Sequence, residues 1–264
     1  MNSKTFKINY KEKELETSVN YKESGKEVII FIHGLGCAKE SFDAAFDFPQ
    51  FNDFSLLAID LVGFGDSSKP QDFTYTMEVQ AEICKLLLDE LNPNRVHIVA
   101  HSMGGAIGLL LAEKLSNKLI SFTNIEGNLI SEDCGLLSRK TISVTFEEFR
   151  KSVFAELKSE TKESNNKSSN LWLEWNEKSN TLAFYSSSES LVKWSDSRKL
   201  LAKFKNLKTK KVYFYGDKNS EMKVLNELGN IGKIEISNSR HFVMNDNPEQ
   251  FYTRLGDFIG GRAN

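Results

Sequence analysis

Ser102 is the side chain in this sequence best placed to act as a nucleophile. It follows a short, mostly apolar run at 96–100 (VHIVA) and precedes a longer leucine-rich run at 103–115. The first run is typical of a buried strand and the second of a helix packed on a sheet. A serine at so sharp a strand-to-helix turn is strained, and its hydroxyl projects above the sheet. The alternative is an ordinary helix-capping serine.

The neighbours of Ser102 fit this turn. Ala100 and Gly104, two residues before and two after, are small, as the close approach of strand and helix requires, although the first position usually carries glycine. The backbone N–H of Met103, at the helix start, then points at an oxyanion that forms on a substrate. A preorganised donor at such a place can lower a barrier by roughly 3 kcal/mol.

A serine hydroxyl is a poor nucleophile unless a neighbouring base takes its proton. The sequence contains four histidines. His33 lies at a glycine-bearing turn, His97 lies within the strand before the serine, and His101 is adjacent to Ser102 and cannot easily face it. His241, on a loop after the last expected strand, is therefore the predicted base, and the alternative is a lone surface histidine.

Several further elements are needed to position these residues. Continuous apolar runs such as 27–32 (EVIIFI) are typical of strands covered on both faces in a parallel sheet. Alternating residues predict an edge hairpin over 4–22. A terminal helix begins near Pro248, with Asp246 as its expected cap. The remaining expected strands are 55–59, 119–125, 211–215 and 233–236, and a helix is expected over 74–91.

The stretch from 129 to 207 differs in character from its surroundings. It carries helical patches, a polar break at 162–169 and all three tryptophans, Trp172, Trp175 and Trp194. We expect a helical cap here that lies over Ser102 and excludes water. Its aromatic side chains then either line a substrate pocket or only pack the cap on the core. The predicted core comprises 1–128 and 208–264.

Composition limits the classes of function. The 264 residues are 40% hydrophobic, which fits one large domain, or one domain with an insertion. Lys+Arg of 34 against Asp+Glu of 36 gives a net charge of −2, without the basic footprint of a nucleic-acid-binding protein. We therefore expect a small-molecule partner and a monomer or homodimer.

Cysteine usage and hydropathy indicate the compartment. Cys37, Cys84 and Cys134 are widely spaced and form no CxxC motif, which predicts free buried thiols in a reducing compartment. The first residues lack the apolar block of a signal peptide, and no run approaches the roughly 18 apolar residues of a membrane span. We expect a cytoplasmic protein.

Three motifs make the chain resemble the α/β-hydrolase family, in its cap-bearing serine esterase form. They are AHSMG at 100–104, HGLG at 33–36 and the D-x-x-G-x-G-x-S turn at 60–67. The resemblance implies a mostly parallel eight-stranded sheet flanked by helices, with a helical cap between strands six and seven. It implies no metal or organic cofactor. It also implies that the backbone N–H of Leu35 is the second oxyanion donor, and that His33 is structural.

The third member of the expected triad departs from the family pattern. The acid usually stands three residues after the glycine that ends the penultimate strand, and counting from Gly216 gives Asn219, which carries no charge. Glu126 ends the strand after the nucleophile strand, from which some family members supply the acid. Asp217 lies on the loop that usually carries the acid, but two residues before the expected position, 219. Asn219 could instead orient His241 as a neutral amide, so all three stay open.

The resemblance implies a serine hydrolase that cleaves an ester or thioester of a small to medium, largely apolar substrate through an acyl-enzyme. Other uses of the fold are carbon–carbon bond hydrolysis, cyanohydrin cleavage (hydroxynitrile lyase type) and cofactor-free haloperoxidation. A catalytically inactive ligand-binding member is a further alternative, because fold alone does not fix function. It is kept open by Asn219 and by Arg240, which stands where the family commonly has glycine.

Overall fold

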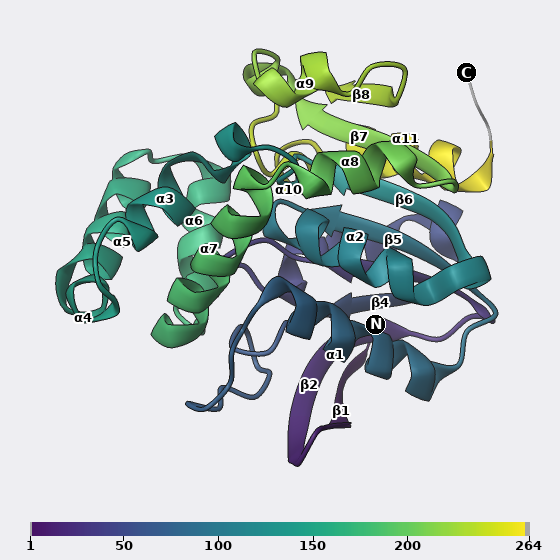
Figure 1. Ribbon diagram of the computed structural model, residues 1–264. Helices are drawn as coiled ribbons and strands as arrows, with labels where there is room; N and C mark the ends of the chain where they lie inside the picture. Colours follow the sequence, from purple (N-terminus) through teal and green to yellow (C-terminus); the bar gives the residue numbers. More distant parts are fainter. Residues whose placement is uncertain (1, 262–264) are drawn as a thin grey trace.

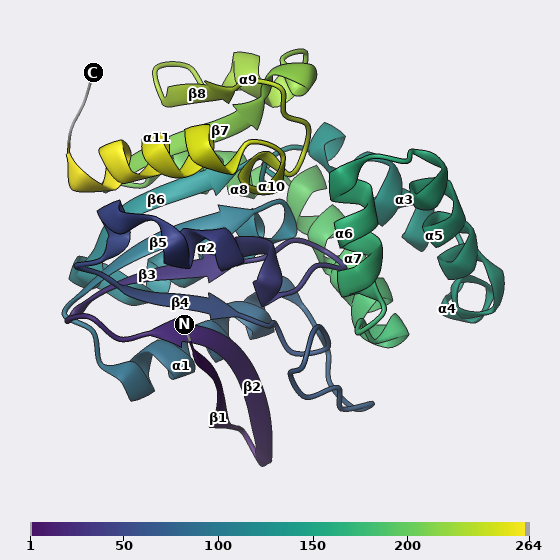
Figure 2. The same ribbon diagram turned by 180° about the vertical axis from the view of Figure 1, so that it is seen from behind.

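The computed structural model describes residues 2–261, and a single eight-stranded sheet runs through its centre (Figures 1 and 2). The strand order is β1-β2-β4-β3-β5-β6-β7-β8. The β1–β2 and β2–β4 pairs are antiparallel, and every other pair is parallel. The strands are β1 (Asn2–Tyr10), β2 (Lys13–Lys22), β3 (Glu27–Ile32), β4 (Ser55–Ile59), β5 (Arg95–His101), β6 (Leu119–Ile125), β7 (Lys210–Gly216) and β8 (Gly232–Ile236).

The central strands are apolar on both faces, as the continuous runs predicted. In β3, Ile29 and Phe31 belong to one apolar cluster and Ile30 and Ile32 to the other, because successive side chains of a strand point to opposite faces. Each cluster is completed by helices. The sheet therefore has one apolar core on each face. The loops that follow the parallel strands lie at the carboxyl ends of those strands.

Helices cover both faces of the sheet (Figures 1 and 2). One face carries α1 (Met77–Leu91), α2 (Met103–Leu115) and α8 (Lys199–Asn206), and the rings of Phe204 in α8 and Phe122 in β6 lie 5.8 Å apart. The other face carries α10 (Val243–Asp246) and α11 (Pro248–Gly260). Shorter segments are η1 (Lys39–Asp47), η2 (Pro49–Phe51), η3 (Ser116–Lys118), η4 (Ser131–Cys134), η5 (Phe149–Val153), η6 (Asp217–Asn219) and α9 (Lys223–Glu227).

The chain between β6 and β7 forms a helical lobe beyond one end of the sheet (Figure 1). Contacts with the core hold the lobe: Trp172 Nε1 donates to Leu35 O at 2.9 Å, and the Lys178 ammonium lies 2.8 Å from the Asp66 carboxylate. The lobe thus lies where the sequence pattern changes character. Its helices are α3 (Gly135–Ile142), α4 (Phe146–Glu148), α5 (Phe154–Glu163), α6 (Lys167–Asn176) and α7 (Thr181–Asp196).

The prediction that Asp246 caps the terminal helix is wrong. Pro248 is the first residue of α11, so the cap falls on Asn247, whose side-chain oxygen accepts from the Gln250 N–H. Asp246 ends α10 instead. Its carboxylate accepts from the Arg240 N–H at 2.8 Å and from the Ser168 hydroxyl of α6, so it joins the loop before His241 to the helical lobe.

The three cysteines are free and buried, as expected, and burial raises the pKa of each thiol. Within residues 2–261, no helix combines the length and apolar character that a membrane crossing requires.

Candidate active site

Ser102 occupies the sharp turn between β5 and α2. Its backbone has φ 53° and ψ −122°, a conformation that non-glycine residues rarely adopt. The Ser102 N–H donates to Ile125 O at 3.0 Å, and its carbonyl accepts from the Gly105 N–H at 2.8 Å. A strained backbone conformation persists only where the surrounding structure holds it, and such residues cluster at active sites. Ser102 is therefore a candidate functional residue.

Glycines allow this turn to form. A Cβ on Gly104 would lie 2.3 Å from Ile32 O, so the start of α2 packs against the end of β3 with no room for a side chain between them. A Cβ on Gly34 would lie 3.0 Å from both Ser102 Cβ and His101 Nδ1. The loop after β3 is thereby packed directly beside the Ser102 side chain.

His241 and Glu126 form a hydrogen-bonded pair. The Nδ1–H of His241 donates to Glu126 Oε2 at 2.8 Å, and the Glu126 side chain is 1% exposed. This bond fixes the tautomer, since it leaves the lone pair on His241 Nε2 free to accept a proton. Among residues 2–261, the Ser102 hydroxyl makes no hydrogen bond with this ring, although both line the same cavity. Catalytic bonds are often loose before substrate binds.

Asp217 lies apart from this pair. Its Oδ1 accepts from the Ser239 N–H at 2.9 Å, and its other oxygen lies 3.3 Å from the Lys218 ammonium. The Ser239 hydrogen bond lowers the pKa of Asp217. The structure therefore brings Glu126, and not Asp217, to His241.

Asn219 also points at Glu126. Its amide nitrogen lies 3.0 Å from Oε1 and 2.8 Å from Oε2 of that carboxylate. The Gly216 N–H donates to Oε1 at 2.8 Å. The Asn219 NH₂ is the donor in these contacts. Asn219 therefore binds the Glu126 carboxylate, and no hydrogen bond joins it to His241 within residues 2–261.

His101 supports the loop that carries His241. Its Nε2–H donates to the His241 carbonyl at 2.9 Å, and the two rings lie 4.6 Å apart. Burial, followed by the nearby His241, holds the pKa of His101 well below its usual range, so the ring is neutral.

Two backbone amides are the candidate oxyanion donors, those of Met103 and Leu35. Met103 is the first residue of α2, so its N–H has no acceptor within the helix. Leu35 follows Gly34 and lines the same cavity as Ser102, and its carbonyl accepts from the indole of Trp172. His33 is buried, and its Nε2 accepts from the Leu61 N–H at 3.1 Å, which is the structural role expected of it.

A cavity of about 580 Å³ joins these groups to the helical lobe. This volume is typical of small-molecule sites. From the lobe, Leu157, Trp172 and Leu191 contribute apolar surface to its lining. Polar side chains of the lobe, among them Glu160, Thr161 and Ser164, line it as well. Of the three tryptophans, Trp172 lines the cavity. Trp175 packs against Phe242, and Trp194 donates to Glu78.

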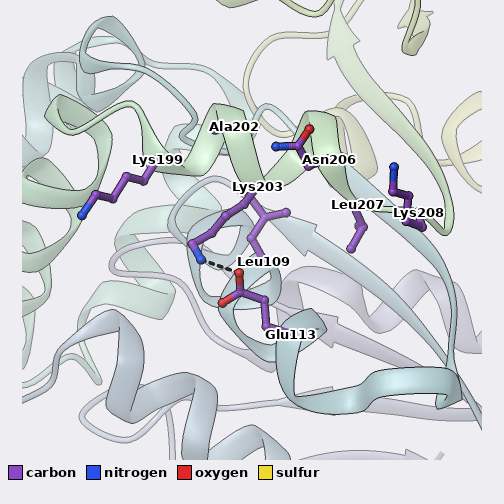
Figure 3. Close-up of a pocket in the computed structure, with 8 residues that line it drawn as sticks. All are labelled: Leu109, Glu113, Lys199, Ala202, Lys203, Asn206, Leu207 and Lys208. Carbon is purple, nitrogen blue, oxygen red and sulfur yellow. Dashed lines mark hydrogen bonds and ion pairs between the residues drawn. The ribbon is translucent and has the colours of Figure 1, made fainter.

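A second hollow, of about 440 Å³, lies between α2 and α8 and shares no lining residue with the first. Figure 3 shows Lys203 directed across it toward Glu113, with which it forms an ion pair. Its lining contains no serine, cysteine or histidine, so it offers no nucleophile–base pair. The lining residues are Leu109, Glu113, Lys199, Ala202, Lys203, Asn206, Leu207 and Lys208.

Two contacts of the site were missed by sequence reasoning: the Trp172 bond to Leu35, and the Asp246 bond to Arg240. Both join segments whose relative placement depends on the lobe. No motif in the sequence signals them.

Comparison with known proteins identifies a family that part of this chain resembles. A model described as alpha/beta hydrolase fold matches residues 27–141. The chain is 42% identical over 99 residues to a protein named "Probable lysophospholipase BODYGUARD 4" from Arabidopsis thaliana, covering 37% of this chain and 24% of that protein. The chain thus spans about a quarter of the length of the first curated relatives that it matches.

Solved structures resemble the whole chain. An esterase from Exiguobacterium antarcticum matches with a TM-score of 0.78 and 15% identity, over 94% of this chain and 96% of that chain. A thermophilic esterase from Thermogutta terrifontis matches with a TM-score of 0.76 and 15% identity, over 99% of each chain. At these identities the likeness concerns the fold. Together with the sheet order and the family model matched by residues 27–141, it shows that the chain has the α/β-hydrolase fold.

Proposed function

We propose that this chain is a serine hydrolase that cleaves an ester or thioester of a small to medium, largely apolar substrate. One observation carries the proposal: Ser102, His241 and Glu126 line a single cavity, and the Glu126 carboxylate accepts from His241 Nδ1. This is the constellation that activates a serine hydroxyl, with Ser102 as nucleophile, His241 as base and Glu126 as acid.

Acylation begins when Ser102 Oγ attacks the substrate carbonyl carbon. His241 Nε2 takes the hydroxyl proton, while Glu126 stabilises the imidazolium that forms. The N–H groups of Leu35 and Met103 donate to the oxyanion. His241 then returns the proton to the leaving alcohol or thiol, and the acyl group stays on Ser102.

Deacylation repeats these steps with water. His241 Nε2 removes a proton from the water molecule, whose oxygen attacks the acyl carbon and forms a second oxyanion at the same two amides. Collapse breaks the bond to Ser102 Oγ, which regains its proton from His241. A carboxylic acid leaves, and no residue is changed over the cycle.

The helical lobe is the proposed lid. Residues 129–207 form the proposed cap, and 1–128 with 208–264 form the hydrolase core. Within the cap, Leu157 and Leu191 give the cavity an apolar wall, which favours an acyl chain over a charged group. Closure of such a wall over the serine excludes water from the reaction.

The names of relatives support ester chemistry. The proteins that this chain resembles include esterases, a lipase and probable lysophospholipases. Three buried free thiols favour action in a reducing compartment, and we propose the cytoplasm, with the protein acting as a monomer or homodimer on a small molecule.

A series of p-nitrophenyl esters with short, medium and long straight acyl chains tests the proposal. We expect wild-type turnover that rises from short to medium chains, and none above background with Ser102→Ala. Tight binding of these esters without product release contradicts hydrolysis and favours an inactive ligand-binding member of the fold.

A further inference from the structure

We propose that Asn219 is a positioning residue that holds the Glu126 carboxylate toward His241. The inference rests on the proposed function, because it concerns the acid of the same site. Asn219 occupies the position where the family pattern places the acid itself. In this chain the residue at that position instead contacts Glu126, the proposed acid, which follows β6.

The contacts of Glu126 carry the first step. Its carboxylate accepts from the Gly216 N–H at 2.8 Å, from the Asn219 amide at 2.8 and 3.0 Å, and from His241 at 2.8 Å. Within residues 2–261, no Lys or Arg side chain lies within ion-pairing distance of this carboxylate, and His241 is the one basic side chain that contacts it. The side chain is 1% exposed, so these donors replace water around a buried charge.

An amide suits this position better than a second acid. Two carboxylates at this separation repel, and one of them holds a proton. The Asn219 NH₂ bridges both oxygens of Glu126 and adds no charge beside the imidazole. It therefore restrains rotation of the carboxylate and keeps Oε2 facing His241.

The turn that carries Asn219 is itself fixed to the loop that carries His241. Asp217 accepts from the Ser239 N–H at 2.9 Å, and the Lys218 N–H donates to Ser239 O at 3.1 Å. Asn219 is thus anchored to the chain segment two residues before the base. Any shift of one loop changes the placement of both His241 and its acid.

Two substitutions separate a positioning role from a merely structural one. Asn219→Leu keeps a similar volume and removes both donors, so we expect kcat to fall by about 10- to 100-fold with KM little changed. Asn219→Asp places a second carboxyl against Glu126, and the proton that this pair holds must leave before Glu126 is again a full acceptor for His241. We therefore expect the acid limb of the kcat/KM profile to move up by about one pH unit.

Lys218→Gln is the matched control, since Lys218 belongs to the same turn and its side chain is half-exposed toward solvent. It should keep wild-type kcat and the wild-type acid limb. Thermal unfolding of each variant establishes that it is folded. A wild-type kcat in Asn219→Leu, together with an unmoved acid limb in Asn219→Asp, overturns the proposal.

A measurement without turnover distinguishes this inference from the proposed function. The proton resonance of the His241 Nδ1–H···Glu126 bond, assigned with His241→Ala, should be present in wild type and Lys218→Gln and lost in Asn219→Leu. An unchanged resonance in Asn219→Leu overturns the positioning role. If wild-type Ser102 fails to react with a fluorophosphonate, the proposed function fails, and this resonance still decides the role of Asn219.

Discussion

Glu126 Oε2 lies 2.8 Å from His241 Nδ1, across 115 residues of sequence. Glu126 follows β6 directly, has φ 42° and reaches over the end of β7. The backbone N–H of Glu126 donates to Phe214 O at 3.0 Å, so its place is set by the pairing of these two strands. The acid candidate therefore lies at the carboxyl end of β6, and not in the loop after β7.

Replacement of Glu126 should disable turnover. In Glu126→Gln the side-chain amide can donate toward His241 Nδ1, which favours the wrong tautomer of the ring. We expect kcat to fall by roughly 10³-fold or more, as in other serine–histidine–acid sites with this change. Asp217→Asn is the control, because its remaining oxygen can still accept from the Ser239 N–H. A large loss in Asp217→Asn, with little in Glu126→Gln, would move the acid to the later loop.

The indole of Trp172 should support the loop of Leu35. Trp172→Phe keeps an aromatic ring but removes the bond to the Leu35 carbonyl, which is worth about 0.5–1.5 kcal/mol. We expect kcat to fall by about three- to tenfold. Trp194→Phe also loses a bond, to Glu78, but away from Ser102, and its kcat should stay at the wild-type value. Equal losses in both variants would contradict a specific link between the lobe and this loop.

The turn at Ser102 should not tolerate a methyl group at Gly104. Because the added Cβ would lie 2.3 Å from Ile32 O, we expect Gly104→Ala to lower the free energy of unfolding by about 1–3 kcal/mol or more. Gly260→Ala is the comparison, since nothing lies within 4 Å of the added atom near the end of α11. It should be neutral or stabilising by up to about 1 kcal/mol. Urea unfolding measures both, and equal stability of the two variants contradicts the packing argument.

The ion pairs of Asp66 should make stability depend on pH. Lys178 and Lys39 lower the pKa of Asp66 to about 2. Because this pKa lies below that of the unfolded chain, the ionised group stabilises the protein fully above about pH 4, and the contribution is lost as pH falls through about 2. Asp66 is 48% exposed, so the pairs are worth at most about 1 kcal/mol each.

Thermal unfolding at pH 5 and pH 2.5 tests this dependence. Asp66→Asn should lose less stability between the two pH values than wild type does. Lys178→Met should also reduce this loss of stability, but by less than Asp66→Asn does, because Lys39 still lies 2.8 Å from Asp66. An identical loss in wild type and Asp66→Asn contradicts the assignment.

The turn at Ser102 and the strands could be predicted because their signals are local. The apolar run before Ser102 and the glycines after it fix a strand, a turn and a helix within 21 residues of sequence. The acid could not be chosen in this way. Glu126 meets His241 only through the register that pairs Ile125 with Phe214, and no local pattern distinguishes it from Asp217.

The interior of the lobe was also beyond prediction. The aromatic content of 129–207 indicated a packed unit, but the side that each ring faces depends on how α6 and α7 lie on the loop of Leu35. Trp172 lines the cavity, while Trp175, in the same helix, packs against Phe242. The cap of the terminal helix was expected at Asp246, but Pro248 is the first residue of α11, so the cap is Asn247.

Reaction with a fluorophosphonate, followed by intact mass, tests the central claim most directly. The reagent phosphonylates a serine only where a base and an oxyanion site are assembled around it. We predict one adduct on the wild-type protein and none on Ser102→Ala at the same concentration. A folded wild-type protein that forms no adduct, or an adduct that persists in Ser102→Ala, would contradict the assignment of Ser102 as an activated nucleophile.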